Sequence, residues 1–126
     1  MNPAVYDAGA LIAADRSERV IWAEHRVRLE ADVIPSVPAP VVAQVSRSSR
    51  QAQLRRFLRG CDIAAFAEPD AHAAGRLLSR SKTSDIVDAA VVILAVAHAA
   101  EIVTADRDDI TRLVIAARAS LPIVET

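Results

Sequence analysis

Several aspartates in this chain stand directly beside strongly apolar segments. They are Asp7, Asp85, Asp88, Asp106 and Asp108. A buried carboxylate without a partner is costly, so a set of carboxylates that the fold gathers is most simply explained by a hard cation, which prefers oxygen ligands. These residue types therefore suggest a site for a divalent metal ion.

The elements that must position these acids alternate between short β-rich runs and longer helical patterns. We expect strands at 5–6, 33–35, 63–66, 102–104 and 122–124, and helices at 8–14, 18–32, 41–46, 50–58, 69–79, 85–99 and 108–117. Such alternation predicts an α/β protein with a central parallel sheet of about five strands flanked by helices. Hydrophobic residues make up 52% of the 126 residues but aromatics only 3%, which suits helices packed on a buried sheet. We expect one domain, 1–126.

The predicted topology brings two of the acids to one place. Asp7 follows the first strand and Asp106 follows the fourth. In open parallel sheets, ligands bind outside the carboxyl ends of the strands. Both carboxylates should therefore lie at the same edge of the sheet.

Helix capping is the competing explanation for each acid. Asp7 could cap the helix that follows it, and Ser84 could cap the helix in which Asp85 and Asp88 favour the positive end of the dipole. For Asp85 both explanations stay open, whereas Asp88 lies in a helix that is apolar on nearly every face. After the fourth strand we expect Asp108 or Asp109 to be the cap, because Asp106 comes too early in the turn.

A run of arginines without an intervening acid lies between Gln44 and Gly60. It contains Arg47, Arg50, Arg55, Arg56 and Arg59. Arginine matches the geometry of phosphate, so the run suits a phosphodiester substrate. A solvated helix face that binds an acidic protein segment explains each single arginine equally well.

The chain lacks the residue patterns that several other classes of function require. The one cysteine, Cys61, precludes an internal disulfide and fits a reducing cytoplasm. His25, His72 and His98 have no metal-ligand spacing, which argues against zinc, and no glycine-rich phosphate loop or nucleophile elbow occurs. The N-terminus lacks the features of a signal peptide, and the longest apolar run, 89–97, is too short for a membrane span. We expect a cytoplasmic protein without a membrane partner.

Three short motifs resemble those of the PIN-domain ribonucleases, in particular the VapC-type toxins of toxin–antitoxin pairs. They are Tyr6-Asp7-Ala8-Gly9-Ala10-Leu11-Ile12-Ala13, Asp88-Ala89-Ala90-Val91-Val92-Ile93-Leu94-Ala95 and Val103-Thr104-Ala105-Asp106-Arg107-Asp108. The resemblance implies a three-layer PIN-like fold, Mg²⁺ or Mn²⁺ held by the acids, cleavage of RNA, a homodimer and an antitoxin partner. It assigns catalysis and metal binding to Asp7, Asp88 and Asp106, with Asp85 and Asp108 as further metal contributors.

One position departs from the family. The family usually has a glutamate in the helix after the second strand, and this chain has Gln44. A glutamine carbonyl can bind a cation or its water but brings no charge. Either Asp85 supplies the missing charge, or metal binding is weak. The alternative function is therefore a catalytically weakened or inert module that binds a protein partner.

Overall fold

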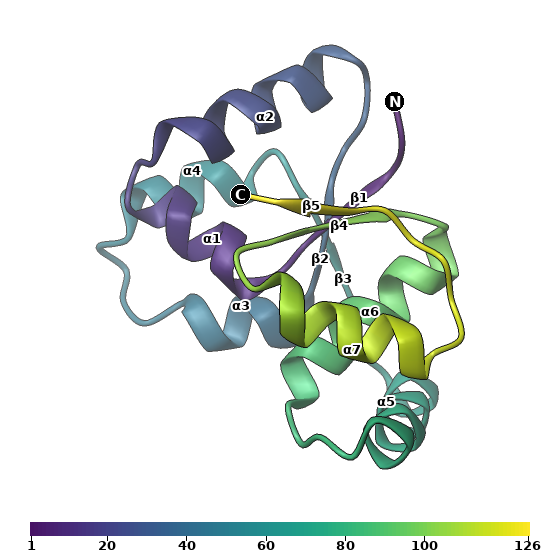
Figure 1. Cartoon of the computed structure of the whole chain (residues 1–126). Helices are drawn as coiled ribbons and strands as arrows, with labels where there is room; N and C mark the ends of the chain where they lie inside the picture. Colours follow the sequence, from purple (N-terminus) through teal and green to yellow (C-terminus); the bar gives the residue numbers. More distant parts are fainter.

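Short strands alternate with helices along the whole chain (Figure 1). A computed structural model describes all residues from Met1 to Thr126. The strands are β1 (Ala4–Tyr6), β2 (Ser36–Pro38), β3 (Asp62–Ala64), β4 (Glu101–Thr104) and β5 (Ile123–Glu125). The helices are α1 (Ala8–Asp15), α2 (Arg19–Glu30), α3 (Ala39–Val45), α4 (Ala52–Leu58), α5 (Glu68–Ser81), α6 (Ile86–His98) and α7 (Arg107–Ala116).

The strands form one parallel sheet in the order β3-β2-β1-β4-β5. In the register of the central strand, Val5 pairs with Ser36 on one side and with Ile102 on the other. The chain builds outward from β1 to β3, then returns to the other side of β1 to add β4 and β5. The direction therefore reverses between β1 and β4, the point at which ligands bind in open parallel sheets. The predicted five-stranded parallel α/β architecture is confirmed.

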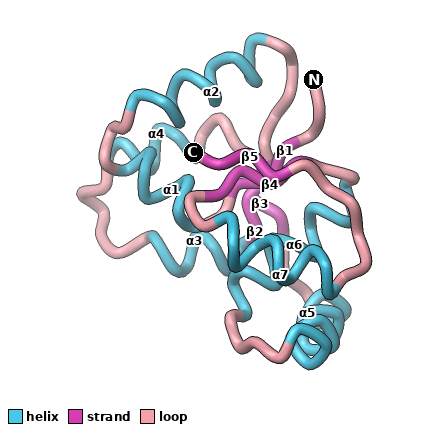
Figure 2. The backbone as a smooth tube through the Cα atoms, viewed as in Figure 1, coloured by secondary structure: helices cyan, strands magenta, loops and turns pink.

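Helices pack around the sheet in two groups (Figure 2). α1 contacts β1 and β4 and packs against α2, α3 and α4, whereas α6 contacts β1, β2 and β4 and packs against α5 and α7. Right-handed crossovers in opposite directions place helices on opposite faces of a sheet. The result is the expected three-layer arrangement. None of the helices has the length and hydrophobicity needed to cross a membrane.

Small aliphatic residues fill most of the core, as the composition indicated. Tyr6 and Phe57 are the largest side chains that are fully buried. In α6 the first three turns bury Ala89, Ala90, Val91, Val92 and Ala95. The last turn of α6 is exposed, so this helix is less completely buried than its sequence indicated.

The second strand lies three residues later than predicted. We expected it at 33–35, but β2 is Ser36–Pro38. Asp32 adopts a left-handed φ of 60°, and the Val33 backbone N–H donates to the Arg28 carbonyl oxygen at 2.9 Å. This hydrogen bond is typical of a Schellman-type helix end. Val33 therefore completes the end of α2 and does not begin a strand. Pairing with both neighbours then makes a strand of this segment, although Ser36 and Pro38 have weak β propensity.

Gly60 directly follows Arg59, the C-cap of α4, but it does not end the helix in a left-handed conformation, since no glycine of this chain has a positive φ. A Cβ atom on Gly60 would lie 2.8 Å from His25 Nε2, so close packing is what requires glycine here. The strand that follows is Asp62–Ala64 rather than 63–66, and Phe66 packs against the core from the next loop.

A buried polar network anchors α2 to the sheet. Arg28, only 3% exposed, donates to Tyr6 Oη at 3.3 Å, and its Nη2 lies 3.5 Å from Glu101 Oε1. Tyr6 Oη lies 2.9 Å from His25 Nδ1. Burial and the charge of Arg28 lower the pKa of His25 to about 4, so this ring is neutral when it shares the hydrogen bond with the tyrosine hydroxyl. The network joins β1, β4 and α2 behind the carboxyl edge of the sheet.

Candidate functional site

Asp7 follows β1 and is 4% exposed. Its Oδ1 accepts a hydrogen bond from the Ala10 backbone N–H at 2.9 Å, which makes Asp7 the N-cap of α1. Its Oδ2 accepts a hydrogen bond from the Thr104 hydroxyl. Burial raises the pKa of Asp7, and these hydrogen bonds act in the opposite direction. Asp7 is therefore a rigidly held, largely inaccessible carboxylate.

The end of β4 connects Asp7 with the next acid. Thr104 is completely buried, and its Oγ1 also accepts the Asp106 backbone N–H at 2.9 Å. A Cβ atom on Gly9 would lie 2.6 Å from Ala105 Cβ, so glycine allows α1 to approach this turn. The sheet thus brings Asp7 and Asp106 to one edge, as the sequence predicted.

Asp85 and Asp88 lie at the beginning of α6. Asp85, not Ser84, is the N-cap, because its Oδ1 accepts the Asp88 backbone N–H at 3.0 Å. The pKa of Asp88 is raised to about 7, first by burial and then by the negative charges of neighbouring aspartates. In decreasing order of effect these neighbours are Asp85, Asp7, Asp109 and Asp106. Asp88 is therefore the centre of an acid cluster drawn from α6, β1 and α7.

The beginning of α7 corrects one prediction. Asp106 is the N-cap of this helix and accepts the Asp109 backbone N–H at 3.4 Å, so the capping explanation that we set aside for Asp106 does apply. Asp109, which the sequence offered only as a cap, belongs to the cluster, and its hydrogen bond with the Asp106 carboxyl raises its pKa. Asp108 is exposed, does not line the cavity next to Asp88, and is not among the main causes of the raised pKa of Asp88.

A repeated pattern could have revealed Asp109. Both helices that supply the cluster begin with two aspartates three residues apart, Asp85 with Asp88 and Asp106 with Asp109. In each pair the carboxylate of the first aspartate accepts a hydrogen bond from the backbone N–H of the second. Gln44, at the position of the family glutamate, is exposed on α3 and makes no side-chain hydrogen bond.

The donor set suits a hard divalent cation, but the carboxylates do not converge. All candidate ligands are oxygen atoms with several negative charges within electrostatic reach of Asp88, which is what Mg²⁺ or Mn²⁺ requires. No group of three potential ligands gathers around one point, because three of the acids cap helices instead. A metal ion would therefore need side-chain rotation at the edge of the sheet.

A cavity of about 220 Å³ opens onto the acid cluster. Its lining consists of Thr83, Ser84, Asp85, Asp88, Asp109, Arg112 and Leu113. Six of the seven lining residues are polar or charged, and the cavity lies at the N-terminal ends of α6 and α7. It is the accessible approach to Asp88, since Asp7 is closed off behind it.

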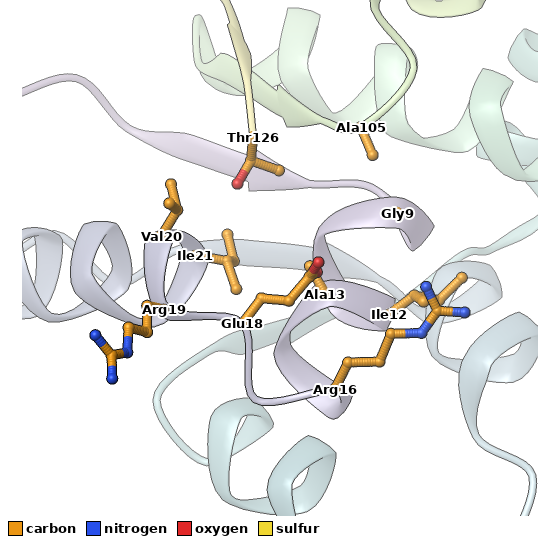
Figure 3. A pocket seen from close by; sticks show the side chains of 10 residues that line it. All are labelled: Gly9, Ile12, Ala13, Arg16, Glu18, Arg19, Val20, Ile21, Ala105 and Thr126. Carbon is orange, nitrogen blue, oxygen red and sulfur yellow. The ribbon is translucent and has the colours of Figure 1, made fainter.

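The largest cavity of the chain, about 530 Å³, lies elsewhere (Figure 3). It is bounded by α1, the start of α2, the turn after β4 and the C-terminal residue. Its lining consists of Gly9, Ile12, Ala13, Arg16, Glu18, Arg19, Val20, Ile21, Ala105 and Thr126. One carboxylate side chain cannot build a metal centre, so this cavity, half of whose lining residues are apolar, is not the acid site.

The predicted arginine run lies around α4. All five arginines are exposed and none is paired with a carboxylate. Arg47 donates to the Ala43 carbonyl oxygen in α3, Arg55 donates to carbonyl oxygens of the loop before α4, and the Arg56 guanidinium stacks on the Trp22 ring at 5.2 Å from its centroid. Arg50 and Arg59 have no intrachain partner for their side chains.

The fold, with its acids at the point where strand order reverses, is that of the PIN-domain proteins of the VapC and FitB type. The resemblance read from the motifs is thus confirmed at the level of the fold. No protein-family model matches the chain, and no curated protein matches it in sequence.

Three solved structures show how far the similarity extends. VapBC2 from Rickettsia felis, bound to a DNA fragment from its promoter, contains a chain that is 17% identical with a TM-score of 0.70, and the match covers 98% of both chains. PAE2754 from Pyrobaculum aerophilum is 13% identical with a TM-score of 0.63, covering 96% of this chain and 90% of that one. FitAcB from Neisseria gonorrhoeae contains a chain that is 15% identical with a TM-score of 0.62, and the match covers 97% of this chain and 96% of that one.

Proposed function

We propose that this protein is a metal-dependent endoribonuclease and the toxin of a toxin–antitoxin pair. The observation that carries the proposal is the environment of Asp88, a partly buried carboxyl that shares the acid cavity with Asp85 and Asp109 and whose pKa four other aspartates raise. The fold of VapC- and FitB-type proteins supports it. Perturbed carboxyls gathered at the carboxyl edge of a parallel sheet are typical of functional sites.

Asp7, Asp88 and Asp106 would hold Mg²⁺ or Mn²⁺, with Asp85 as a further contributor. Asp109 suits the remaining position better than Asp108, because it lines the acid cavity. When bound, the ion would supply an activated water and neutralise charge on the scissile phosphate. The chain itself holds Asp7 in place through the Thr104 hydroxyl and the Ala10 N–H.

RNA is the proposed substrate, and a small antitoxin is the proposed protein partner. Similarity to chains of VapBC2 and FitAcB supports a partnered system, and the cytoplasmic location stays an expectation from the sequence. Clustered carboxylates repel one another without a metal ion, so a basic side chain from the antitoxin would be stabilised among them. The apolar cavity beside the site offers a surface for the rest of such a partner. A homodimer is expected from the family resemblance.

A specific observation favours a second candidate, an inert module that binds a protein partner. Gln44 brings no charge, and Asp7, Asp85 and Asp106 all cap helices in this structure. A chain that needs these carboxylates only as caps would keep its fold without any metal.

Cleavage of RNA separates the two candidates. Purified protein incubated with total RNA should cut it in the presence of Mg²⁺ or Mn²⁺ and not in EDTA. Asp88→Asn keeps the shape of the side chain and removes its charge, so it should lower the rate by orders of magnitude while the protein stays folded. An Asp88→Asn variant as active as the parent would contradict the catalytic assignment. A parent without metal-dependent cleavage would favour the binding module.

A further inference from the structure

Two segments of the chain carry cations and no acid. They are residues 71–84, at α5, and residues 110–124, at α7 and beyond. Their cations are Arg76, Arg80, Lys82, Arg112 and Arg118. All five are exposed, and none forms an ion pair. Because α5 and α7 pack against each other, the two segments form one surface, which we call the α5–α7 basic surface (Figure 1).

This surface begins inside the acid cavity. Arg112 lines that cavity together with Asp88 and Asp109, yet its guanidinium lies beyond 4 Å of every carboxylate and makes no hydrogen bond. Its charge lowers the pKa of Asp109, which shows that the two groups are close. An arginine at an acid cluster that remains unpaired has all its donors available for a bound anion.

A second cavity, about 360 Å³, continues the surface along α7. Its lining consists of Arg80, Ala116, Ala117 and Arg118. Arg80 uses only Nε internally, donating to the Ala116 carbonyl oxygen at 3.2 Å, and Arg118 makes no hydrogen bond through its side chain. Arg112 and Ala116 lie one turn apart on the same face of α7, about 6 Å along the axis. The two cavities therefore follow each other along one helix.

We infer that the RNA strand crosses the protein along the α5–α7 basic surface, with Arg112 contacting a phosphate at the acid cluster and Arg80 and Arg118 contacting neighbouring phosphates. The inference rests on the proposed nuclease function and deepens it. Phosphate contacts from arginine position a nucleic acid without reading its bases, so the surface selects a polyanionic backbone. Arg112 also offsets the repulsion between that backbone and the aspartates.

The arginines around α4 fit this role less well. Arg47 and Arg55 already donate to backbone carbonyl oxygens of this chain, and Arg56 stacks on Trp22. None of them lines the acid cavity. They form the rival path that the experiment has to exclude.

Three double variants of the full chain separate the paths. Arg112→Gln with Arg118→Gln removes two charges from the α5–α7 basic surface, and Arg50→Gln with Arg59→Gln removes two from the rival path. Arg19→Gln with Arg26→Gln, on α2, is the matched control for net charge. Binding of a fluorescent single-stranded RNA is followed by anisotropy in EDTA at several salt concentrations, and thermal melting verifies that each variant is folded.

The first variant should weaken binding by roughly tenfold or more and reduce the salt slope by about 1.4, because each phosphate contact on a single strand contributes about 0.7. The control should bind like the parent. The inference is overturned if the salt slope of RNA binding falls only in the Arg50→Gln, Arg59→Gln variant, or falls equally in all three double variants. It is also overturned if the parent binds no RNA.

Cleavage in the presence of Mg²⁺ is measured separately. A parent that binds RNA along this surface but never cuts it contradicts the proposed function and not the RNA path. If the Arg112→Gln, Arg118→Gln variant binds and cleaves RNA like the parent, only the RNA path is contradicted.

Discussion

Asp88 has an environment that differs from that of every other acid in the chain. Its carboxyl is half-buried and does not cap its own helix, whereas Asp7, Asp85 and Asp106 each bind a backbone N–H. Its pKa of about 7 follows from burial together with four negative neighbours. Without a cation, this carboxyl resists ionisation near neutral pH.

The raised pKa of Asp88 predicts a pH-dependent stability. Between about pH 4 and 7 the native state holds a proton that the unfolded state releases, so the free energy of unfolding of the metal-free protein should fall as pH rises. Asp88→Asn has no charge to bury. After solvent screening we expect this variant to be more stable than the parent by about 1 kcal/mol at pH 8, or roughly 3–6 °C in Tm, and to differ little from it at pH 4. Thermal melts in EDTA measure Tm at both pH values. If the Tm of the parent and of the variant depended on pH in the same way, the raised pKa would not belong to Asp88.

Capping and charge can be separated at Asp85. Asp85→Asn keeps an oxygen for the Asp88 N–H, whereas Asp85→Ala removes it. The alanine variant should lose about 0.5–2 kcal/mol of stability and the asparagine variant much less, as urea denaturation measures. If Asp85 also compensates for Gln44, Asp85→Asn should weaken Mg²⁺ binding, and Gln44→Glu should soften that loss. Mg²⁺ titration of the parent, both single variants and the double variant tests this, and additivity within about 0.5 kcal/mol would exclude compensation.

Among the elements, the end of β4 does most to organise the site. Thr104 occupies the last position of the strand and joins the carboxylate after β1 to the first turn before α7. One hydroxyl therefore sets the separation of Asp7 and Asp106. The close approach of α1 to the same turn, which Gly9 permits, adds a second constraint.

Removing that hydroxyl should destabilise the protein. Thr104→Val keeps the shape but leaves one oxygen of buried Asp7 and the Asp106 N–H without partners, a cost of about 1–3 kcal/mol. Thr104→Ser keeps the hydroxyl and loses only a methyl group, about 0.8 kcal/mol. Urea denaturation should rank the valine variant below the serine variant, and RNA cleavage should follow the same order. Equal stability of the two variants would show that the hydroxyl does not organise the site.

At the scale of the whole molecule, the acid cluster lies between two different surfaces. The α5–α7 basic surface adjoins it on one side, and the larger apolar cavity reaches Gly9 and Ala105 on the other. The two surfaces are distinct, so a polyanionic substrate and a protein segment can each bind next to the acid cluster. Inhibition by an antitoxin then requires only that one bound partner extend a basic group across the acid cluster.

A co-expressed antitoxin should form a complex that cuts RNA far more slowly than the free protein. Val20→Asp places a charge on an exposed side chain of the apolar cavity, so it should weaken the complex without loss of Tm. Ile115→Asp, an equally exposed aliphatic residue on α7, is the control and should leave the complex intact. Affinity is measured by titration calorimetry. A stable complex with full RNase activity would refute the inhibitory role.

The sequence by itself determined the architecture and the edge of the sheet at which the acids meet. Alternating apolar runs and helical patterns predict a parallel sheet, and this local information suffices to place Asp7 and Asp106 after strands. It also located every helix within a few residues. These features follow from periodicity, which each segment carries in its own residues.

Only the tertiary structure decided which residues form the second strand and which acids share one environment. Ser36 and Pro38 have little strand preference of their own, and their segment forms a strand because β1 and β3 lie on either side. Asp109 joins the cluster and Asp108 does not because a helix turns its side chains by about 100° per residue, so the N-cap at Asp106 sets the direction of each. Arg112 meets Asp88 only because α6 and α7 pack with their N-terminal ends together, and long-range packing of that kind leaves no mark on local sequence.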